Sequence, residues 1–280
     1  MEISGRTQVV GIIGDPVAHS LSPAMHNAAF RALHLDFVYV PFHVPPAQLR
    51  AAVAGVRALG IAGINVTVPH KERVMAFLDS VSETGQRAGA VNTIVQRDGR
   101  LHGENTDATG FLRSLDEVKF RVRGARVLMI GAGGSARAVL TALGAGHAAA
   151  VTIANRTVRR AQQLVRRCGP AEMQLAVTGL TSLEDAALLA SVDLVVNATS
   201  VGLRSERFFP LAYAATPRHC LFFDLLYGRA TDFLKAAGRA HRRTVDGTGM
   251  LLHQGAAAFT LWTGRRAPLA VMRRALRAAL

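Results

Sequence analysis

Two side chains in the first half of the chain are of the types that a hydride-transfer reduction requires. Lys71 and Asp107 each follow a predicted strand, and residues at two strand ends can converge at one edge of a sheet. The reduction of a ketone by hydride leaves an alkoxide, which needs a proton and a nearby positive charge. A lysine can supply both, and a carboxylate can orient the lysine and bind a neighbouring hydroxyl. We therefore predict a catalytic pair, with a solvated lysine at a helix start as the alternative for Lys71.

The scarcity of lysine makes position 71 informative. The formal net charge is +14, but lysine occurs only at positions 71, 119 and 235, so 30 of the 33 basic residues are arginines. Arginine keeps its proton, with a pKa above about 12, and could hardly replace a proton-donating lysine. So basic a chain also raises the possibility of a nucleic-acid or polyanion partner. The arginines are scattered, never more than two in a row, so we interpret the charge as a bias in composition and expect no nucleic-acid partner.

Two serines could bind a carboxylate. Ser22 stands directly before Pro23, a residue that is well tolerated in the first turn of a helix, and Ser20 lies two residues earlier. Hydroxyl groups and the free N–H groups of a helix N-terminus together suit an anion. An ordinary N-cap is the alternative, and it explains one serine better than two.

An amide and a hydroxyl follow on a predicted strand. Asn65 and Thr67 are two residues apart, so their side chains point to the same face of the strand. The opposite face is apolar, with Ile64, Val66 and Val68. The two polar side chains could hold a ligand, and a solvent-facing polar surface is the alternative.

A glycine-rich turn opens the second half of the chain. The run Gly131-Ala132-Gly133-Gly134-Ser135-Ala136 follows an apolar strand and precedes a helical pattern, which is the context of a dinucleotide-binding turn. In such a turn the glycines let a pyrophosphate approach the backbone at the helix N-terminus. A tight strand-to-helix turn without a ligand is the alternative.

The end of the next predicted strand favours NADP over NAD. NAD sites usually carry Asp or Glu there, to bind the ribose hydroxyls, whereas this chain has Asn155-Arg156-Thr157. No carboxylate repels a 2′-phosphate, and the Arg156 guanidinium can pair with it. Arg159 and Arg160 follow on the next helix. In so arginine-rich a chain the presence of Arg156 alone could be accidental, but the missing acid is not explained in that way.

The predicted elements divide into two patterns. In the first half we expect strands over 9–13, 37–44 and 64–68, a hairpin of 92–96 with 101–104, helices over 23–33 and 47–59, and short helical pieces over 73–78 and 83–88. After residue 107 strands alternate with helices: the strands are 126–130, 151–154, 174–177, 194–197 and 221–224, and the last helices are 249–262 and 268–279. Such alternation predicts a doubly wound parallel sheet of Rossmann type. The fold class is therefore α/β, an N-terminal α/β domain followed by a dinucleotide-binding domain.

The bulk composition fits a cytoplasmic protein of two domains. A length of 280 residues suits two cores, no apolar stretch reaches the roughly 18 residues of a membrane span, and no export signal is visible. Cys168 and Cys220 show neither metal-ligand spacing nor a clear reason to pair. We expect no metal, no membrane association and a reducing compartment.

Eight segments, in this order, resemble the shikimate dehydrogenase family: HSLSPAMHN, GINVTVPHKE, GAVNTI, ENTD, GAGGSARAV, NRT, NATSVGL and LLHQGAAAFTLWTG. They are spread along the chain from residue 19 to residue 264, so the resemblance extends over nearly its whole length. The resemblance implies reversible reduction of 3-dehydroshikimate to shikimate by NADPH, in aromatic biosynthesis, with a small-molecule substrate as the partner. It implies that the final helices, 251–280, complete a substrate domain of residues 1–107, and that 108–250 form the NADP-binding domain.

The resemblance also implies roles for individual residues. Lys71 and Asp107 form the catalytic pair, and the substrate contacts are Ser20, Ser22, Asn65, Thr67, Asn92, Tyr227 and Gln254. The cofactor contacts are Glu83, Gly131, Ala132, Gly133, Gly134, Ser135, Asn155, Arg156, Thr157, Arg160, Asn197, Ala198, Thr199, Leu225, Gly247 and Met250. The chain departs from the family pattern at Leu203, where methionine is usual, and at Gly228-Arg229, where Asn-Pro is frequent, which puts turnover and cofactor geometry in question but not the fold.

The sequence is also compatible with three other functions. A sister enzyme acting on quinate, with NAD or NADP, would differ near Ser20 and Ser22, because quinate carries an extra hydroxyl on the carbon that bears the carboxylate. A catalytically quiet ligand sensor on the same fold would be favoured if Lys71 or Asp107 were missing, and both are present. A polyanion-binding protein rests on the charge alone. The sequence is compatible with a monomer or a homodimer.

Overall fold

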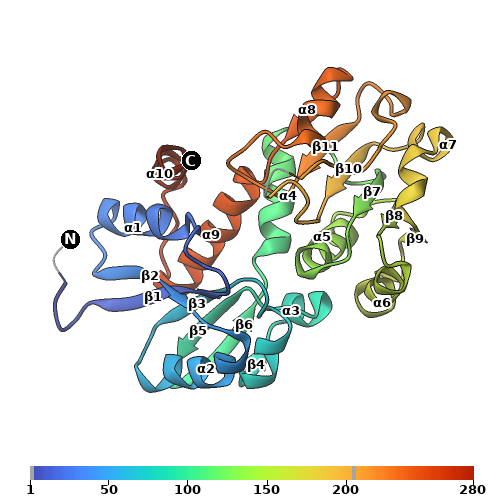
Figure 1. The fold of residues 1–280 in the computed structure, drawn as a ribbon. Coiled ribbons are helices and arrows are strands. Elements are labelled where there is room, and N and C mark those ends of the chain that lie inside the picture. The colour runs from blue at the N-terminus through green and yellow to red at the C-terminus, as the bar shows by residue number, and fades with distance from the viewer. Residues whose placement is uncertain (1–2, 204–205) are drawn as a thin grey trace. The chain divides into compact units, whose positions relative to one another are not determined.

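The computed structural model describes residues 3–203 and 206–280 and divides the chain into two compact units (Figure 1). Unit 1 consists of Met1–Gly110 together with Leu251–Leu280, and unit 2 consists of Phe111–Met250. The chain passes between the units inside two helices, α4 (Asp107–Glu117) and α9 (Thr248–Thr263). The blue and the red ends of the chain in Figure 1 therefore belong to the same unit.

Unit 1 is built on a mixed sheet with the strand order β2-β1-β3-β5-β6-β4. The strands β1 (Gln8–Gly14), β2 (Phe37–His43) and β3 (Gly63–Val66) are parallel. β3 then pairs antiparallel with β5 (Thr93–Arg97), which forms a hairpin with β6 (Arg100–Glu104), and β4 (Ser80–Val81) lies along β6. Asp98 and Gly99 both have positive φ, as the tightest hairpin turns require.

Two hydrophobic clusters lie on opposite faces of this sheet, because successive side chains of a strand alternate. Val10 and Ile12 of β1 pack in a cluster with α1 (Ser22–Ala32), α9 and α10 (Leu269–Ala279). Ile13 packs in the other cluster, with α2 (Leu49–Ala58) and the 3-10 turn Arg73–Phe77. The C-terminal helices thus supply one of the two layers that cover the sheet of unit 1.

Unit 2 contains a parallel sheet with the order β12-β11-β10-β7-β8-β9. Its strands are β7 (Arg126–Ile130), β8 (Ala150–Ala154), β9 (Gln174–Thr178), β10 (Leu194–Asn197), β11 (Leu221–Asp224) and β12 (Arg243–Val245). The helices are α5 (Gly134–Ala145), α6 (Val158–Cys168), α7 (Ala186–Leu189) and α8 (Asp232–Arg239). From β7 the chain first builds β8 and β9 on one side and then returns to build β10 to β12 on the other. The switch point of this Rossmann-type sheet therefore lies between β7 and β10, where such sheets bind their ligands.

The third strand ends earlier than the sequence indicates. β3 stops at Val66, whereas the apolar run predicts a strand to Val68, and the Val68 side chain is 62% exposed. Thr67 still donates its N–H to Ile13, but the Val68 carbonyl turns to the N–H of Asp15. Proline follows at 69, and its ring leaves no N–H to continue the pairing.

Smaller differences concern elements too short for a periodic pattern. The strands β4 and β12 are absent from the sequence prediction, because two or three residues cannot show an alternation. The helix expected from residue 47 begins with a 3-10 turn, Pro46–Gln48, and the piece expected over 73–78 is a 3-10 turn as well. Among the described residues, no helix is both long enough and apolar enough to cross a membrane.

Candidate active site

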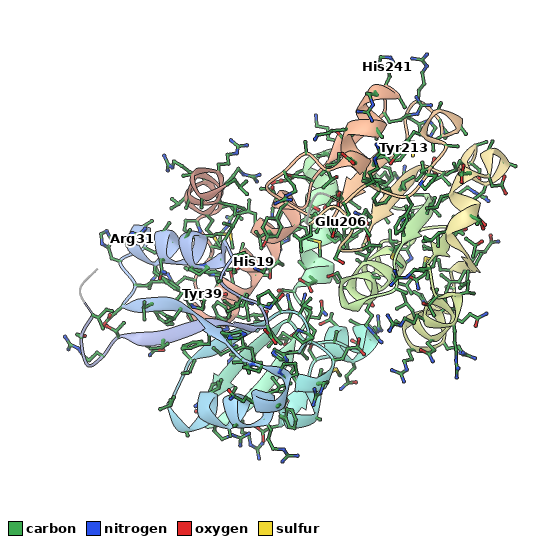
Figure 2. The ribbon with its side chains drawn as sticks, in the orientation of Figure 1. His19, Arg31, Tyr39, Glu206, Tyr213 and His241 are labelled. Atoms are coloured by element: carbon green, nitrogen blue, oxygen red, sulfur yellow. The ribbon has the colours of Figure 1, made fainter. Side chains whose placement is uncertain are left out.

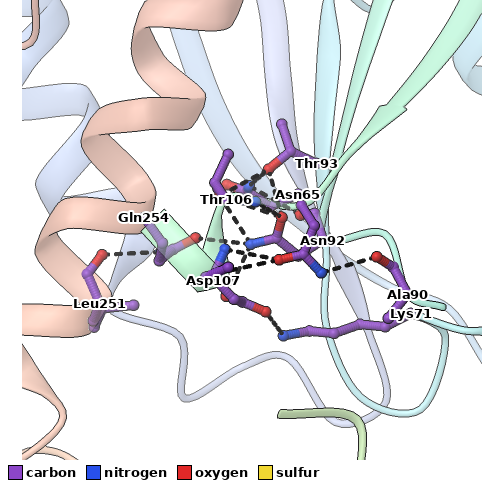
Figure 3. A network of polar contacts seen from close by, with 11 residues as sticks. Asn65, Lys71, Ala90, Asn92, Thr93, Thr106, Asp107, Leu251 and Gln254 are labelled. Atoms are coloured by element: carbon purple, nitrogen blue, oxygen red, sulfur yellow. Dashed lines mark hydrogen bonds and ion pairs between the residues drawn. The ribbon is translucent and has the colours of Figure 1, made fainter. Parts of the chain in front are cut away.

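The structure brings Lys71 and Asp107 together. The Lys71 Nζ lies 2.7 Å from the Asp107 Oδ2, and only 13% and 8% of the two side chains are exposed (Figure 3). Asp107 is the first residue of α4, and the Asn105 side chain before it accepts the N–H groups of Asp107 and Ala108. The Asn105 amide also donates to the Ala90 carbonyl. A helix cap therefore fixes the carboxylate, and the alternative of a freely solvated Lys71 does not hold.

An amide holds the second oxygen of Asp107. The Asn92 Nδ2 donates to Asp107 Oδ1 at 2.9 Å and to Thr106 Oγ1 at 2.9 Å, and it lies 3.3 Å from Gln254 Oε1 (Figure 3). The Asn92 Oδ1 accepts the N–H of Thr106 at 2.7 Å. Gln254 lies on α9, so the C-terminal segment contributes to the polar cluster around the Lys71–Asp107 pair.

Asn65 extends this cluster through buried groups. Its Nδ2 donates to Thr93 Oγ1 at 3.0 Å and to the Asn92 carbonyl at 3.2 Å, and its Oδ1 accepts the hydroxyl of Tyr39 at 2.8 Å. Only 4% of Asn65 is exposed, so the alternative of a polar, solvent-facing surface is wrong for this residue. Thr67 lies just beyond the end of β3 and is half-buried.

The two serines lie at the start of α1 but do not cap it. The helix begins at Ser22, and no side chain caps it at the preceding residue, Leu21. The Ser20 Oγ accepts the N–H of Ser22 at 3.3 Å. Burial raises the pKa of the Tyr39 phenol, and a hydrogen bond with the Ser22 side chain opposes the rise. Tyr39, labelled in Figure 2, therefore links Ser22 to Asn65.

The glycine-rich turn of unit 2 has room for a ligand. Gly131 has φ +111°, and a Cβ there would lie 2.9 Å from both the Ala198 carbonyl oxygen and a Thr199 methyl. Cβ atoms at Gly133 and Gly134 would meet nothing within 4 Å, so the backbone at the start of α5 is open to a close approach. No side chain caps this helix. Its free N–H groups fit a pyrophosphate.

Exposed arginines follow the end of β8. The strand ends at Ala154, and the Asn155 Nδ2 donates to the Thr157 carbonyl at 2.8 Å, which shapes the turn before α6. Arg156, Arg159 and Arg160 are all exposed, so their guanidinium groups are free to meet an anion from solvent. This set fits a 2′-phosphate and lacks the carboxylate that would bind a ribose diol.

The remaining residues that the resemblance assigns to the cofactor or the substrate lie in several places. Asn197 ends β10, Ala198 and Thr199 follow it, and Leu225 follows β11. A Cβ at Gly247 would lie 2.2 Å from the Leu225 carbonyl oxygen, so only glycine fits there. Burial raises the pKa of Tyr227. Met250 is buried at the start of α9, and Glu83 lies in unit 1 on α3 (Glu83–Ala88), in an exposed ion pair with Arg87.

Several residues in these networks are absent from the sequence-based candidates. Tyr39, Thr93, Asn105 and Thr106 all contact predicted site residues. Thr93, Asn105 and Thr106 lie within two residues of Asn92 or Asp107, in the segments GAVNTI and ENTD, and that position is the signal that could have marked them. Tyr39 carries no such signal.

The fold and these groups together define an oxidoreductase of two α/β units, one of them a Rossmann-type unit for a dinucleotide. Models of known families match three parts of the chain. The "Shikimate dehydrogenase substrate binding domain" matches residues 12–94, "Shikimate / quinate 5-dehydrogenase" matches 114–232, and "Shikimate 5'-dehydrogenase C-terminal domain" matches 247–277.

Individual proteins agree with these models over the full length. The "Shikimate dehydrogenase (NADP(+))" of Symbiobacterium thermophilum is 48% identical, over 99% of this chain and 96% of its own. The shikimate 5-dehydrogenase of Thermus thermophilus, solved in complex with NADP(H) and shikimate, is 39% identical with a TM-score of 0.86, over 98% of this chain and 100% of its own. A quinate dehydrogenase from Corynebacterium glutamicum, solved with NAD, is 31% identical with a TM-score of 0.89, over 97% and 99%. The chain belongs to the shikimate dehydrogenase family.

Proposed function

We propose that this protein catalyses the reversible reduction of 3-dehydroshikimate to shikimate with NADPH. The observation that carries the proposal is the buried Lys71–Asp107 ion pair, whose carboxylate is held by Asn92. The names of the relatives in Symbiobacterium and Thermus support the substrate and the cofactor. Cys168 and Cys220 are buried thiols rather than halves of a disulfide, which supports a reducing cytoplasmic location.

In the proposed reaction the Lys71 ammonium protonates the oxygen of the substrate ketone. When bound, NADPH supplies the hydride that converts the carbonyl carbon to a secondary alcohol carbon. The C=O π pair becomes a lone pair on oxygen, and this oxygen takes the proton from Lys71 Nζ. Asp107 keeps the ammonium in place and, in the reverse direction, favours the return of the proton to Nζ. Water then restores the proton on Lys71.

Polar groups around the pair would hold the substrate. Ser20 and Ser22 suit its carboxylate, since the N-terminus of α1 has no side-chain cap and both serines lie there. Asn65, Thr67, Asn92 and Gln254 suit its ring hydroxyls. The opened glycine turn at Gly131–Ser135 would take the pyrophosphate of the cofactor, and Arg156, with Arg160, its 2′-phosphate.

A two-by-two assay tests the proposal. Purified protein is given shikimate or quinate with NADP+ or NAD+, and formation of the reduced cofactor is followed by absorbance. We expect shikimate with NADP+ to react far faster than the other three combinations. Equal or higher rates with quinate would refute the substrate, and no activity in any combination would favour a ligand sensor.

The second candidate is a quinate dehydrogenase that uses NAD. It is favoured by the full-length similarity to the Corynebacterium enzyme. The end of β8 disfavours it, because the chain has Asn155 and Arg156 where an NAD site usually has a carboxylate. The same assay decides between the two.

A further inference from the structure

A buried carboxylate in unit 2 has no role in the proposed reaction. Asp224 ends β11, is 0% exposed, and forms no ion pair with any basic side chain among the described residues. Burial raises its pKa, and the nearby acid Asp246 adds to the rise. A buried charge without a counter-charge lowers stability unless hydrogen bonds compensate for it. We therefore expect hydrogen bonds to hold the Asp224 carboxylate.

Three donors converge on this carboxylate. The Oδ1 accepts the Nδ2 of Asn197 at 2.9 Å and the N–H of Leu226 at 3.0 Å, and the Oδ2 accepts the hydroxyl of Thr231 at 2.6 Å. Every partner donates, so the ionised form of Asp224 fits the geometry. The donors come from three different segments: Asn197 ends β10, Leu226 follows β11 and Thr231 directly precedes α8 (Figure 1).

Two of the three bonds of Asp224 continue into loops at the carboxyl end of the sheet. Held by Asp224, Asn197 turns its Oδ1 toward Thr199 and accepts both the N–H (3.0 Å) and the hydroxyl (2.7 Å). Thr199 then lies against Gly131, the first glycine of the dinucleotide turn. On the other side, the Leu226 carbonyl accepts the N–H of Gly247 at 2.9 Å.

We propose that Asp224 is a positioning residue, which fixes the loops after β10 and β11 and the segment at Gly247 so that they bind the nicotinamide half of the cofactor. This inference rests on the proposed function. The arginines proposed for the adenosine 2′-phosphate follow β8, on one side of the switch point, whereas β10 to β12 lie on its other side, so the loops after these strands fall to the nicotinamide half. No hydrogen bond of Asp224 reaches the arginines. Loss of Asp224 should therefore weaken the binding of the nicotinamide half of the cofactor and leave the binding of the adenosine half unchanged.

The test measures two ligands on the full-length Asp224→Ala variant by isothermal titration calorimetry. NADP+ spans both halves of the proposed site, and adenosine 2′,5′-bisphosphate contains only the adenosine half. We expect NADP+ to bind 10- to 100-fold more weakly to the variant, and adenosine 2′,5′-bisphosphate to bind within about twofold of the unmodified protein. Shikimate affinity, measured without cofactor, should not change.

Two further variants separate positioning from charge and from folding. Asp224→Asn keeps an oxygen for Asn197 and Leu226, and Thr231 can accept from its new amide, so NADP+ affinity should stay within about threefold. Asp193→Asn is the matched control, because Asp193 also accepts a backbone N–H, that of Arg126 at 2.8 Å, but lies before β10 at the opposite end of the sheet. It should bind both ligands normally.

The outcomes are distinct. Unchanged NADP+ binding in Asp224→Ala, or an equal loss of both ligands, would overturn the proposal, as would an equal loss in Asp224→Asn. If Asp224→Ala does not fold, Asp224→Leu fills the same space without acceptors, and failure of both to fold would make Asp224 a residue of the fold alone. If the unmodified protein binds no NADP+, the proposed function fails first, and the two failures are thereby distinguished.

Discussion

Lys71 is the residue on which the proposed chemistry depends most directly. Its ammonium is largely buried and faces a carboxylate at 2.7 Å, so removal of the side chain removes the proton donor and leaves Asp107 held by Asn92. We predict that Lys71→Ala lowers kcat by about 10³-fold or more, because general acid catalysis is typically worth about 10² to 10⁴. The Kd for shikimate, from calorimetry, should change little.

Lys71→Arg is the matched variant for this prediction. Arginine keeps the positive charge beside Asp107 but does not release a proton near neutral pH. It should therefore be nearly as slow as the alanine variant. A near-normal kcat with either replacement would show that position 71 only orients the substrate.

Arg156 governs the choice between the two cofactors in the proposed site. Its guanidinium is exposed after β8 and can meet a 2′-phosphate with charge-assisted hydrogen bonds. We predict that Arg156→Ala lowers kcat/KM for NADP+ by about 30- to 10³-fold, since one or two such bonds, discounted for solvent, are worth roughly 2–4 kcal/mol. The value for NAD+ should be nearly unchanged.

Arg160 offers the control for this prediction. If Arg159 and Arg160 also bind the phosphate, the loss of kcat/KM for NADP+ in Arg156→Ala will be about 30-fold. The double variant Arg156→Ala/Arg160→Ala will then show a larger loss. A higher salt concentration should weaken the binding of NADP+ more than that of NAD+, because the additional affinity for NADP+ is electrostatic. Equal losses for both cofactors would assign Arg156 to the adenine pocket.

Side chains that would contact a ligand can be predicted from the sequence more readily than side chains that contact only other protein groups. Lys71 and Asp107 are identifiable because their chemistry is rare, and the scarcity of lysine strengthens the inference. Thr93, Asn105 and Asp224 act on other protein groups, and nothing in their type or spacing reveals that. Their partners become visible only when Asn65, Ala90 and Asn197 are placed in space.

Among the elements, α1 shows how a helix start can be kept for a ligand. The helix begins at Ser22 without a side-chain cap, and Ser22 is hydrogen-bonded instead to the Tyr39 phenol. We predict that Ser22→Ala raises the KM for shikimate about 10- to 100-fold, because a hydrogen bond to a charged group is worth about 1.5–3 kcal/mol. If Ser22 only held the Tyr39 phenol, the variant would instead keep its KM and lose about 1 kcal/mol of stability.

The elements predictable from sequence are those with a long pattern. The strand over 126–130 and the hairpin near Asp98-Gly99 follow from an apolar run and a turn signal, and the structure has both. The end of β3 is not predictable in this way, because Val68 continues the apolar alternation and yet lies in solvent. The end of the strand is set by the hydrogen bond from the Asp15 N–H to the Val68 carbonyl. A sequence pattern does not show a hydrogen bond between residues so far apart in the chain.

A buried histidine makes the stability of the whole protein depend on pH. His26 is fully buried, stacks on Tyr39 at a centroid distance of 4.5 Å, and neither ring nitrogen has a hydrogen-bond partner among the described residues. Burial lowers its pKa from 6.5 to about 3. Between these two pH values the unfolded chain binds a proton that the folded chain does not, so stability falls as the pH falls.

We predict that His26 lowers the free energy of unfolding by about 2 kcal/mol at pH 5 relative to pH 7.5, from one proton at about 1.4 kcal/mol per pH unit below 6.5. Urea denaturation at the two pH values measures it. His26→Phe should lose this part of the pH dependence, whereas His19→Gln, a change at an exposed histidine labelled in Figure 2, should keep it. An unchanged pH dependence in His26→Phe would show that other groups cause it.

The C-terminal helices also have a consequence for the order in which the protein is made. Met25 and Phe30 of α1 are buried against Phe259 and Met272, which the ribosome adds only after the whole of unit 2. Unit 2, in contrast, is one continuous stretch that ends at Met250. At about 5 to 20 residues per second, residues 251–280 take roughly 2 to 6 s to add. During those seconds all of unit 2 has been synthesised, while unit 1, although begun earlier, still lacks the helices that cover one face of its sheet and has an apolar face that a chaperone can bind.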